Sequence, residues 1–383
     1  MFTLQQALDA IKDKPEFQVK ENPLGFTCID YYISDNKTFL NEDGSRSMIC
    51  ENLRGTKFDT KTGLIVCLGY HKFHNYMENP DYAPEKINLS EKRWFLEKLD
   101  GSMIATLWLN DQWYFTTRAG ITDVSDQALE FVTSNADRLG VYDKFIREWS
   151  KLGFTCIFEF CSRLNQVVVD YPETKLVLTG IRSNLDGHYI DYDNMVIIAQ
   201  DSNIPVVNEF DVSGTVEQIA EKIKVLPASQ EGIVVRFENG FMVKIKGGAY
   251  VSLHRAKDGL RFEKNVVEMI LTNLVDDTLA LLDESTKSRL EAYRDTMVEH
   301  IKLVEAQIER EFENLKALPD AKTFAFFAKR SRFDKFLFAK RNGKNLTVRD
   351  VILKHCGSQS KIEEVRYLIG EQRWNAPANE VDQ

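Results

Sequence analysis

The chain has 383 residues, of which 43% are hydrophobic and 28% charged, and its formal net charge is −9. This length and composition predict a soluble globular protein with two or so domains. The six cysteines show no paired CxxC spacing and no matching histidine pattern, so they indicate neither a zinc site nor a disulfide framework. No apolar run is long enough to cross a bilayer, and we expect a cytoplasmic protein, in the host cytoplasm if its source is viral, with no membrane partner.

Short β-rich runs dominate residues 26–253, after a short amphipathic helix expected at residues 1–14. Alternating apolar residues predict one hairpin around Asn110-Asp111 and another around Glu238-Asn239-Gly240. Further strands are predicted for "CIFEF", "QVVVDY" and "KLVLTGI", and a helical stretch over residues 125–151 interrupts the series. These elements predict an α+β domain, built mainly from antiparallel strands, over residues 1–257.

The pattern becomes helical after residue 258. Apolar residues at steps of three and four predict one long amphipathic helix that ends at Pro319; they are Leu290, Tyr293, Met297, Ile301, Val304, Ile308, Phe312 and Leu315. Such stripes usually bury apolar area, so we interpret this one as a packing face rather than a ligand groove. Residues 258–383 are therefore predicted to form an all-helical C-terminal domain.

A strongly basic segment lies within this helical region. Residues 322–361 hold 11 lysines and arginines against two acidic residues, Asp334 and Asp350, although the whole chain is acidic. Several phenylalanines lie among these cations, and such a composition suits phosphate neutralisation beside packing or stacking rings. Most of the rings are expected in the core, and a solvated helix face is the competing interpretation of the cations. The segment is a candidate RNA-binding surface.

The stretch "EKLDGSMI", residues 97–104, places Lys98 two residues before an Asp-Gly pair. Asp-Gly is common in tight turns, and the apolar runs on either side of it would make an ordinary hairpin without any chemistry. The alternative is that Lys98 is a nucleophile placed where a strand ends. An isolated K-x-D-G pattern is weak evidence, so this alternative depends on the residues that accompany it.

The accompanying residues follow one order along the chain. They are "ENLRG" with Arg54, "HKFHN" with Lys72, "FTCIFEF" with Glu159, "EGIVV" with Glu231, and "VKIKGGAYVSLH" with Lys244 and Lys246. This succession resembles the covalent nucleotidyltransferase superfamily of ATP-dependent ligases and capping enzymes, and most of all the RNA ligase 1 family of the T-even bacteriophages. The resemblance covers most of residues 50–257 and is thin beyond them. It implies an antiparallel-sheet nucleotidyltransferase domain with an ATP-grasp-like ligase fold.

The resemblance makes Lys98 a nucleophile that attacks the α-phosphate of ATP, with Gly101 in the nucleotide site and Asp100 orienting the lysine or a metal. The attacking amine must be unprotonated, although an exposed lysine titrates near 10.4. Lys244 and Lys246 would lower the pKa of Lys98 by like-charge repulsion and would also neutralise charge on the phosphate. Because strand side chains alternate, residues 244 and 246 face the same way.

Three further cations are implied to hold phosphates. Arg54 and Lys72 match the family's clamp on the β- and γ-phosphates, and Arg118 stands where a lysine is usual in the family. Arg118 keeps the charge, but a planar guanidinium is not a point charge, which puts the phosphate geometry there in doubt. Solvation at the surface is the competing interpretation of these side chains.

Two acids are implied to lie near a metal. Glu159 alternates with Phe158 and Phe160, so it points either to solvent or into a polar pocket, and the family implies the pocket. Glu231 would help to hold Mg²⁺, with Mn²⁺ as a substitute, because these cations prefer oxygen ligands; its competing interpretation is a turn residue.

Val234 matches the aliphatic residue against which the family places adenine, and Leu178 or Thr179 would form the opposite wall; core packing competes for all three. The residues leave the hairpin register open, since a two-residue loop would put Val235 opposite Lys244 and a three-residue loop would put Val234 there. The resemblance favours the longer loop.

The implied function is that of an ATP-dependent RNA ligase, which joins 3′-OH and 5′-phosphate ends through a lysyl-AMP and an RNA-adenylate in the repair of RNA or tRNA. The expected partners are such RNA ends, in particular nicked tRNA, and a polynucleotide kinase/phosphatase that acts upstream; the chain is expected to be a monomer. A DNA ligase or an mRNA-capping enzyme should continue into a small β-barrel after "KIK" rather than into helices. A non-catalytic RNA-binding protein with a retained nucleotide fold is the remaining alternative.

Overall fold

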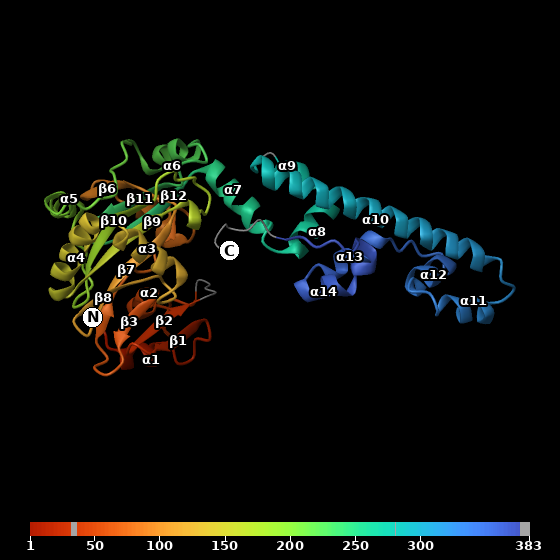
Figure 1. The fold of residues 1–383 in the computed structure, drawn as a ribbon, viewed down its shortest axis with the longest axis horizontal. Coiled ribbons are helices and arrows are strands. Elements are labelled where there is room, and N and C mark those ends of the chain that lie inside the picture. Colours follow the sequence, from red (N-terminus) through yellow and green to blue (C-terminus); the bar gives the residue numbers. More distant parts are fainter. Residues whose placement is uncertain (32–36, 280, 376–383) are drawn as a thin grey trace. The chain divides into compact units, whose positions relative to one another are not determined.

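The computed structural model describes residues 1–31, 37–279 and 281–375. The chain divides into two compact units, one over Met1–Val251 and one that begins at Ser252. The division falls inside helix α7 (Gly248–Gly259), a few residues before the change of pattern in the sequence, because one continuous helix carries the chain out of the first unit. Every strand of the described residues lies in the first unit (Figure 1).

Three four-stranded sheets form the frame of the first unit. In spatial order, the first sheet is β1 (Phe17–Asn22), β2 (Phe26–Tyr31), β3 (Thr56–Asp59) and β4 (Ile65–Cys67). The second is β10 (Lys175–Ser183), β9 (Phe154–Cys161), β7 (Ser102–Leu109) and β8 (Gln112–Thr116). The third is β5 (His74–Asn75), β12 (Met242–Lys246), β11 (Gly232–Phe237) and β6 (Arg93–Glu97). All pairs are antiparallel except β5 with β12, so the predicted α+β architecture of antiparallel sheets is confirmed.

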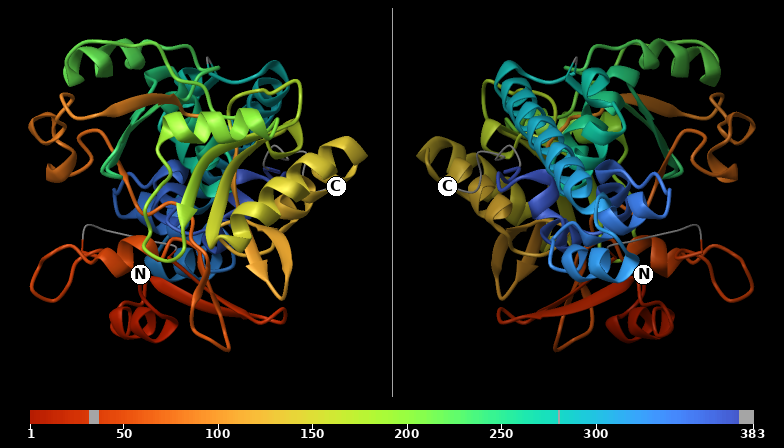
Figure 2. Two further views of the ribbon diagram at one scale, coloured as in Figure 1. Left: turned by 90° about the vertical axis from the view of Figure 1, so that its left-hand side faces the viewer. Right: turned by 90° about the vertical axis from the view of Figure 1, so that its right-hand side faces the viewer.

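Helices cover the sheets of the first unit; they are α1 (Leu4–Ala10), α2 (Met48–Asn52), α3 (Asp123–Thr133), α4 (Ala136–Lys151), α5 (Tyr192–Asp201) and α6 (Val216–Lys224), with 3₁₀ turns at Pro80–Tyr82, Pro84–Lys86 and Arg163–Asn165. Helices α3 and α4 lie side by side and pack on the second sheet (Figure 2). Phe145 and Ile146 of α4 meet Phe158 of β9 in a fully buried core, which fixes the position of the neighbouring Glu159.

The strands on either side of Asp100-Gly101 do not form a hairpin. β6 pairs with β11 in the third sheet, whereas β7 pairs with β8 and β9 in the second. Asp100-Gly101 is therefore the crossover between two sheets, and a Cβ on Gly101 would lie 2.3 Å from the carbonyl oxygen of Phe160. The Asp-Gly pair is explained by this close approach rather than by a two-residue turn.

One predicted strand is wrong. Residues 166–171, "QVVVDY", form no strand in the structure. The amides of Val168 and Val169 each donate a hydrogen bond of 2.7 Å to the carboxylate of Asp100, so these donors are taken by a side chain rather than by a neighbouring strand. A β-rich composition does not reveal such a competitor for backbone donors.

The register left open for the second hairpin is settled by the structure. Val234 pairs with Lys244, Gly232 pairs with Lys246, and Gly240 in the loop has a φ of 89°. The longer loop is confirmed, with the left-handed residue occupied by glycine, which adopts that conformation without steric cost.

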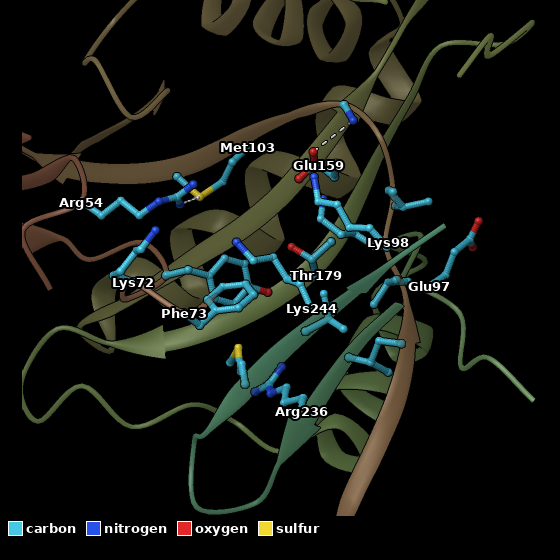
Figure 3. Close-up of a pocket in the computed structure, with 18 of the residues that line it drawn as sticks. Arg54, Lys72, Phe73, Glu97, Lys98, Met103, Glu159, Thr179, Arg236 and Lys244 are labelled. Carbon is cyan, nitrogen blue, oxygen red and sulfur yellow. Dashed lines mark hydrogen bonds between the residues drawn. The ribbon is translucent and has the colours of Figure 1, made fainter. Parts of the chain in front are cut away.

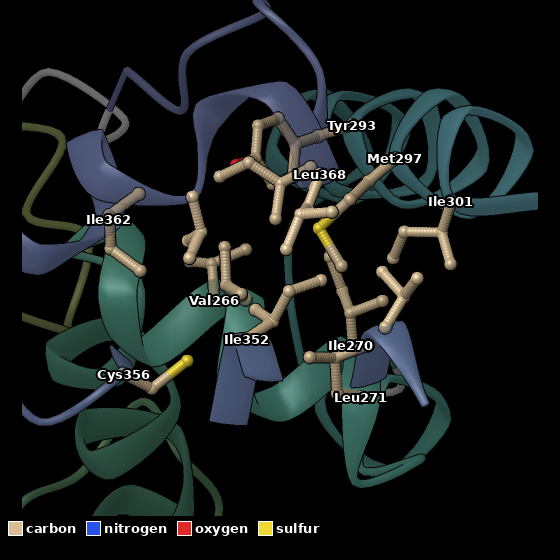
Figure 4. Packing of buried hydrophobic residues seen from close by; sticks show 14 of the residues in the cluster. Val266, Ile270, Leu271, Tyr293, Met297, Ile301, Ile352, Cys356, Ile362 and Leu368 are labelled. Carbon is tan, nitrogen blue, oxygen red and sulfur yellow. The ribbon is translucent and has the colours of Figure 1, made fainter. Parts of the chain in front are cut away.

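The second unit is helical throughout its described residues. After α7 it contains α8 (Glu263–Leu271), α9 (Val275–Leu279), α10 (Glu284–Lys316), α11 (Ala321–Ala328), α12 (Asp334–Arg341), α13 (Val348–His355), α14 (Gln359–Glu364) and α15 (Arg366–Ile369). The predicted long helix is confirmed as α10, whose Asp283 caps the amide of Thr286. Its apolar stripe packs against α8, α13 and the last helices, as Tyr293, Met297 and Ile301 do in Figure 4.

None of the described helices combines the length and the apolar character that spanning a bilayer requires.

Candidate active site

A cavity of about 500 Å³ lies in the first unit and is lined by strands of the second and third sheets (Figure 3). Most of the residues singled out in the sequence line it, namely Arg54, Lys72, Lys98, Gly101, Arg118, Glu159, Val234, Lys244 and Lys246. Asp100 and Glu231 are the exceptions; they are 4% and 3% exposed and lie behind the lining residues.

Lys98 and Lys246 share one buried carboxylate. The Lys98 amine lies 2.7 Å from Oε2 of Glu231, and the Lys246 amine lies 2.9 Å from Oε1 of the same residue. The backbone explains this arrangement, because the amide of Lys98 donates to the carbonyl of Gly232, next to Glu231, and Gly232 pairs with Lys246. Gly232 has a φ of 143°, where a Cβ would lie 2.1 Å from the carbonyl oxygen of Ile245, so this junction requires glycine.

Lys244 is the lysine of the site whose pKa is strongly lowered. Burial is the main cause, the positive charges of Lys72, Arg54 and Lys98 act in the same direction, and together they bring the pKa to about 7. The amine lies 4.9 Å from the centre of the Phe73 ring. A cluster of cations that repel one another in this way has an excess of positive charge, which a polyphosphate would relieve.

The cations expected on the β- and γ-phosphates lie together on one side of the cavity (Figure 3). Lys72 is 3.9 Å from Oε1 of Glu78, and burial lowers its pKa, with Arg54 and Arg118 adding to the effect. Arg118 donates from Nε to Oδ2 of Asp30 at 2.8 Å, so its fork is partly engaged within the protein. Arg54 has a looser contact, 3.8 Å from Nη1 to the sulfur of Met103.

Glu159 points into the cavity, while Phe158 and Phe160 on either side of it are buried in the core. Its Oε1 accepts the amide of Gly101 at 3.1 Å. Burial raises the pKa of Glu159 to about 7, and the negative charges of Glu231 and Asp100 contribute to the rise. Of the two orientations that the sequence allowed, the polar pocket is the one observed.

Of the two acids expected near a metal, Glu159 lines the cavity, whereas Glu231 lies behind the lining with both oxygens paired with lysines. Within residues 1–31, 37–279 and 281–375, no group of three or more His, Cys, Asp and Glu side chains could hold a metal. Mg²⁺ keeps several waters and commonly uses one or two carboxylates besides phosphate oxygens, and the mutual repulsion of Glu159 and Glu231 is what a cation would relieve.

Asp100 lies behind the cavity, and its carboxylate is held by donors of the protein. Its Oδ2 accepts the amides of Val168 and Val169, and its Oδ1 accepts the hydroxyl of Tyr250 at 2.7 Å. The hydroxyl of Tyr171 accepts the Asp100 amide at 3.0 Å. These bonds anchor the loop that carries Lys98 from behind the cavity, an arrangement that suits the expected role of Asp100 in orienting this lysine.

The apolar end of the cavity contains the residues expected around a base. Val234 lines this end of the cavity. Of the two candidates for the opposite wall, Thr179 also lines the cavity, whereas Leu178 is buried in the core. Thr179 is the extra residue at a register shift between β10 and β9. Sequence reasoning missed Phe73 and Arg236, which also line the cavity. Arg236 had a detectable signal, because it lies two residues after Val234 and therefore on the same face of the strand.

The chain is similar to several known proteins. A family model described as RNA ligase matches residues 52–250, more than half of the chain. A Thermovibrio ammonificans protein named "Putative RNA ligase" is 30% identical over 291 residues, which are 73% of this chain and 71% of that protein. A "Putative bifunctional polynucleotide kinase/RNA ligase" of Autographa californica nuclear polyhedrosis virus is 25% identical over 63% of this chain but only 36% of its own length. An archaeal ATP-dependent RNA ligase of known structure aligns with a TM-score of 0.48 and 15% identity over 67% of this chain and 64% of that one. By the family model and the Thermovibrio relative, the chain belongs to the RNA ligase family.

Proposed function

We propose that this RNA ligase uses ATP to join 3′-OH and 5′-phosphate RNA ends through adenylate attached to Lys98. The observation that carries the proposal is the position of the Lys98 amine, which lines a cavity rich in cations and lies at a crossover between two sheets. An ordinary turn lysine would point into bulk water, whereas the Lys98 side chain is 22% exposed.

The first step needs an amine without its extra proton, and Glu231 is placed to accept that proton. Its Oε2 is 2.7 Å from the Lys98 amine, and Lys246 on its other oxygen keeps the buried carboxylate in place. The Lys98 nitrogen then forms a bond to the α-phosphorus of ATP while the bond to pyrophosphate breaks. Arg54, Lys72 and Lys244 bind the phosphates and orient the leaving group.

Glu159, which lines the cavity, would hold a Mg²⁺ ion together with retained waters and phosphate oxygens, whereas Glu231, the other acid expected at the metal, has both oxygens paired with lysines; Mn²⁺ has compatible ligand preferences. When bound there, the metal would neutralise charge that develops on the transferred phosphate.

The later steps move AMP from Lys98 to an RNA 5′-phosphate, after which a 3′-hydroxyl attacks the activated end and AMP leaves. For RNA contacts we propose the basic part of the second unit. On α11 the rings of Phe326 and Phe327 are 54% and 47% exposed, and the guanidinium of Arg330 lies 3.5 Å from the centre of the Phe326 ring. Exposed rings beside cations suit unpaired bases and phosphates. Phe324, Phe333 and Phe336 are buried, as expected for most rings of this segment.

The physiological substrate we propose is a broken tRNA, supplied by an enzyme that removes a 3′-phosphate and phosphorylates the 5′ end. The baculovirus relative supports a link between the two activities, since its name combines a polynucleotide kinase with an RNA ligase. The ends that such a kinase produces are the ends that this mechanism consumes.

The test is incubation with ATP labelled at the α-phosphate and Mg²⁺, followed by a denaturing gel. Wild type should carry the label, K98A should carry none, and K144A, which removes an exposed lysine of α4, should be labelled like wild type. Unlabelled wild type would favour the non-catalytic RNA-binding alternative, and preference for labelled GTP would favour a capping enzyme. Nicked RNA and nicked DNA duplexes then separate RNA joining from DNA joining. β12 is the last strand of the described residues, which argues against the small β-barrel that the DNA ligase and capping alternatives require.

A further inference from the structure

Arg236 of β11 is a buried cation with an unused hydrogen-bond donor. The residue is 2% exposed, and its guanidinium lies 5.2 Å from the centre of the Tyr189 ring. Nη2 donates to the carbonyl of Ile190, but Nη1 is buried and finds no acceptor among the described residues. No carboxylate of those residues forms an ion pair with Arg236 either.

Such a donor is costly unless something binds it. Buried polar groups nearly always have a hydrogen-bond partner, and a charged donor without one loses its hydration without compensation. Arg236 is also one of the residues that line the cavity, so a ligand in the cavity can reach it. The orphaned donor is therefore an indication of a missing acceptor.

The position of Arg236 suggests which part of a nucleotide supplies the acceptor. Gly232, Val234 and Arg236 alternate on one face of β11, so Arg236 lies about 13 Å along the strand from the glycine that binds the Lys98 amide. Figure 3 shows Arg236 beyond Phe73, apart from Arg54 and Lys72. Met242 pairs with Arg236 and also lines this end of the cavity. The surroundings are those of a base rather than of a triphosphate.

We propose that Nη1 of Arg236 donates a hydrogen bond to a ring nitrogen of the purine base and that Arg236 is a base-recognition residue of the ligase. The proposal rests on the proposed function, because it places a nucleotide in this cavity. A guanidinium offers only donors, so it can pair with a ring nitrogen but not with the exocyclic amino group of adenine.

Arg182 provides a matched control. It is 4% exposed and lies 4.6 Å from the centre of the same Tyr189 ring. Its three nitrogens donate within the protein, from Nε to Gly187, from Nη1 to Gly69 and from Nη2 to the side chain of Asn52, and it does not line the cavity. Substitution of Arg182 removes a buried guanidinium that packs on the same Tyr189 ring as Arg236, without removing a donor that faces the cavity.

The experiment compares ATP with its 1-deaza, 3-deaza and 7-deaza analogues, each of which replaces one ring nitrogen by C–H. For wild type, kcat/KM for labelling of Lys98 should fall about tenfold to hundredfold with at least one analogue, the size of a lost hydrogen bond to a charged group. In R236M that penalty should vanish, because the donor is already missing, and ATP itself should react as slowly as the analogue does with wild type. R182M should lower the thermal midpoint but keep the wild-type penalty.

Three results would overturn the proposal: wild type that uses all three analogues as well as ATP, a penalty that persists in R236M, or a penalty that R182M also abolishes. If R236M does not fold, R236K replaces it. The lysine side chain is shorter and lacks the guanidinium fork, so the penalty for the deaza analogue should be smaller than in wild type, and an undiminished penalty counts against the proposal. Binding of ATP and the same analogues measured by calorimetry separates this inference from the proposed function. An analogue penalty in binding that depends on Arg236 supports the inference even if Lys98 takes no label.

Discussion

Glu231 holds two lysines with its two carboxylate oxygens, and this sharing links Lys98, the proposed nucleophile, to Lys246 of β12. The carboxylate is 3% exposed, while the Lys98 and Lys246 side chains are 22% and 29% exposed. A buried charge of this kind is tolerated only while it is paired, so the pair also keeps the crossover and β12 in register.

The shared carboxylate predicts non-additive effects on stability. K98M or K246M alone leaves Glu231 with one partner, and each should lower the free energy of unfolding by about 1 kcal/mol. K98M/K246M leaves the charge unpaired and should cost about 3–5 kcal/mol, more than the sum of the single changes. Denaturant unfolding of the four proteins measures the coupling; a sum of the single effects that matches the double variant within about 0.5 kcal/mol would contradict it.

Lys244 predicts how ATP capture depends on pH. Burial and neighbouring cations bring its pKa to about 7, so the free enzyme loses this positive charge as pH rises through 7. An arginine at this position stays charged throughout. We therefore compare kcat/KM for labelling of Lys98 in wild type and in K244R. The wild-type value divided by the K244R value should fall by up to about tenfold per pH unit above 7. A ratio that is constant from pH 6 to 9 would show that Lys244 does not titrate in the free enzyme.

The same shift predicts that Lys244 destabilises the fold. Between pH 7 and 10.5 the unfolded chain binds a proton at Lys244 that the folded chain does not, so this residue makes stability rise with pH in that window. K244M should raise the free energy of unfolding by about 1–2 kcal/mol at pH 7, a value reduced from the full shift because the cavity admits solvent. This gain in the free energy of unfolding should shrink towards zero near pH 10.5. K244M should also label Lys98 about a hundredfold or more slowly than wild type, because it lacks a cation that binds phosphate. A loss of stability at pH 7 would refute the interpretation.

At the scale of elements, the crossover at Asp100-Gly101 and the hairpin of β11 and β12 assemble the site. Their glycines permit it for different reasons, a close approach at Gly101 and a left-handed backbone at Gly240.

Substitution of Gly101 tests the close approach. G101A places a Cβ 2.3 Å from a backbone oxygen of β9, so it should cost about 3 kcal/mol or more by forcing β7 away from β9. G140A is the matched control, since a Cβ there meets nothing within 4 Å and the residue lies inside α4; it should stabilise the protein by about 0.5–1 kcal/mol. Thermal and denaturant unfolding measure both changes. G101A with stability within 1 kcal/mol of wild type would show that the crossover adapts easily.

What the sequence could predict follows from local and periodic information. The apolar steps along α10 and the alternation at residues 244 and 246 depend only on helix and strand periods, and both are observed. The crossover between sheets and the capture of the Val168 amide by Asp100 depend on partners far away in the chain, which no local pattern encodes. The same limit explains why the ion pairs of Glu231 were not foreseen, whereas the position of Arg236 on the face of Val234 could have been read from strand alternation.

At the scale of the molecule, all residues that line the cavity precede Ser252, and the second unit has an apolar core of its own. The proposed chemistry of Lys98 and the proposed contacts with RNA are thus carried by separate units.

This separation predicts that the two activities can be divided. A fragment that ends at Gly259, the last residue of α7, keeps Tyr250 and its bond to Asp100, and should label Lys98 within about fivefold of the full chain because its site is intact. Joining of a nicked RNA should fall about a hundredfold or more, since the basic segment of residues 322–361 is absent. F326A/F327A in the full chain should weaken joining without affecting labelling, because each stacked base contributes about 1–3 kcal/mol. A folded fragment that joins RNA as well as the full chain does would move the RNA contacts back to the first unit.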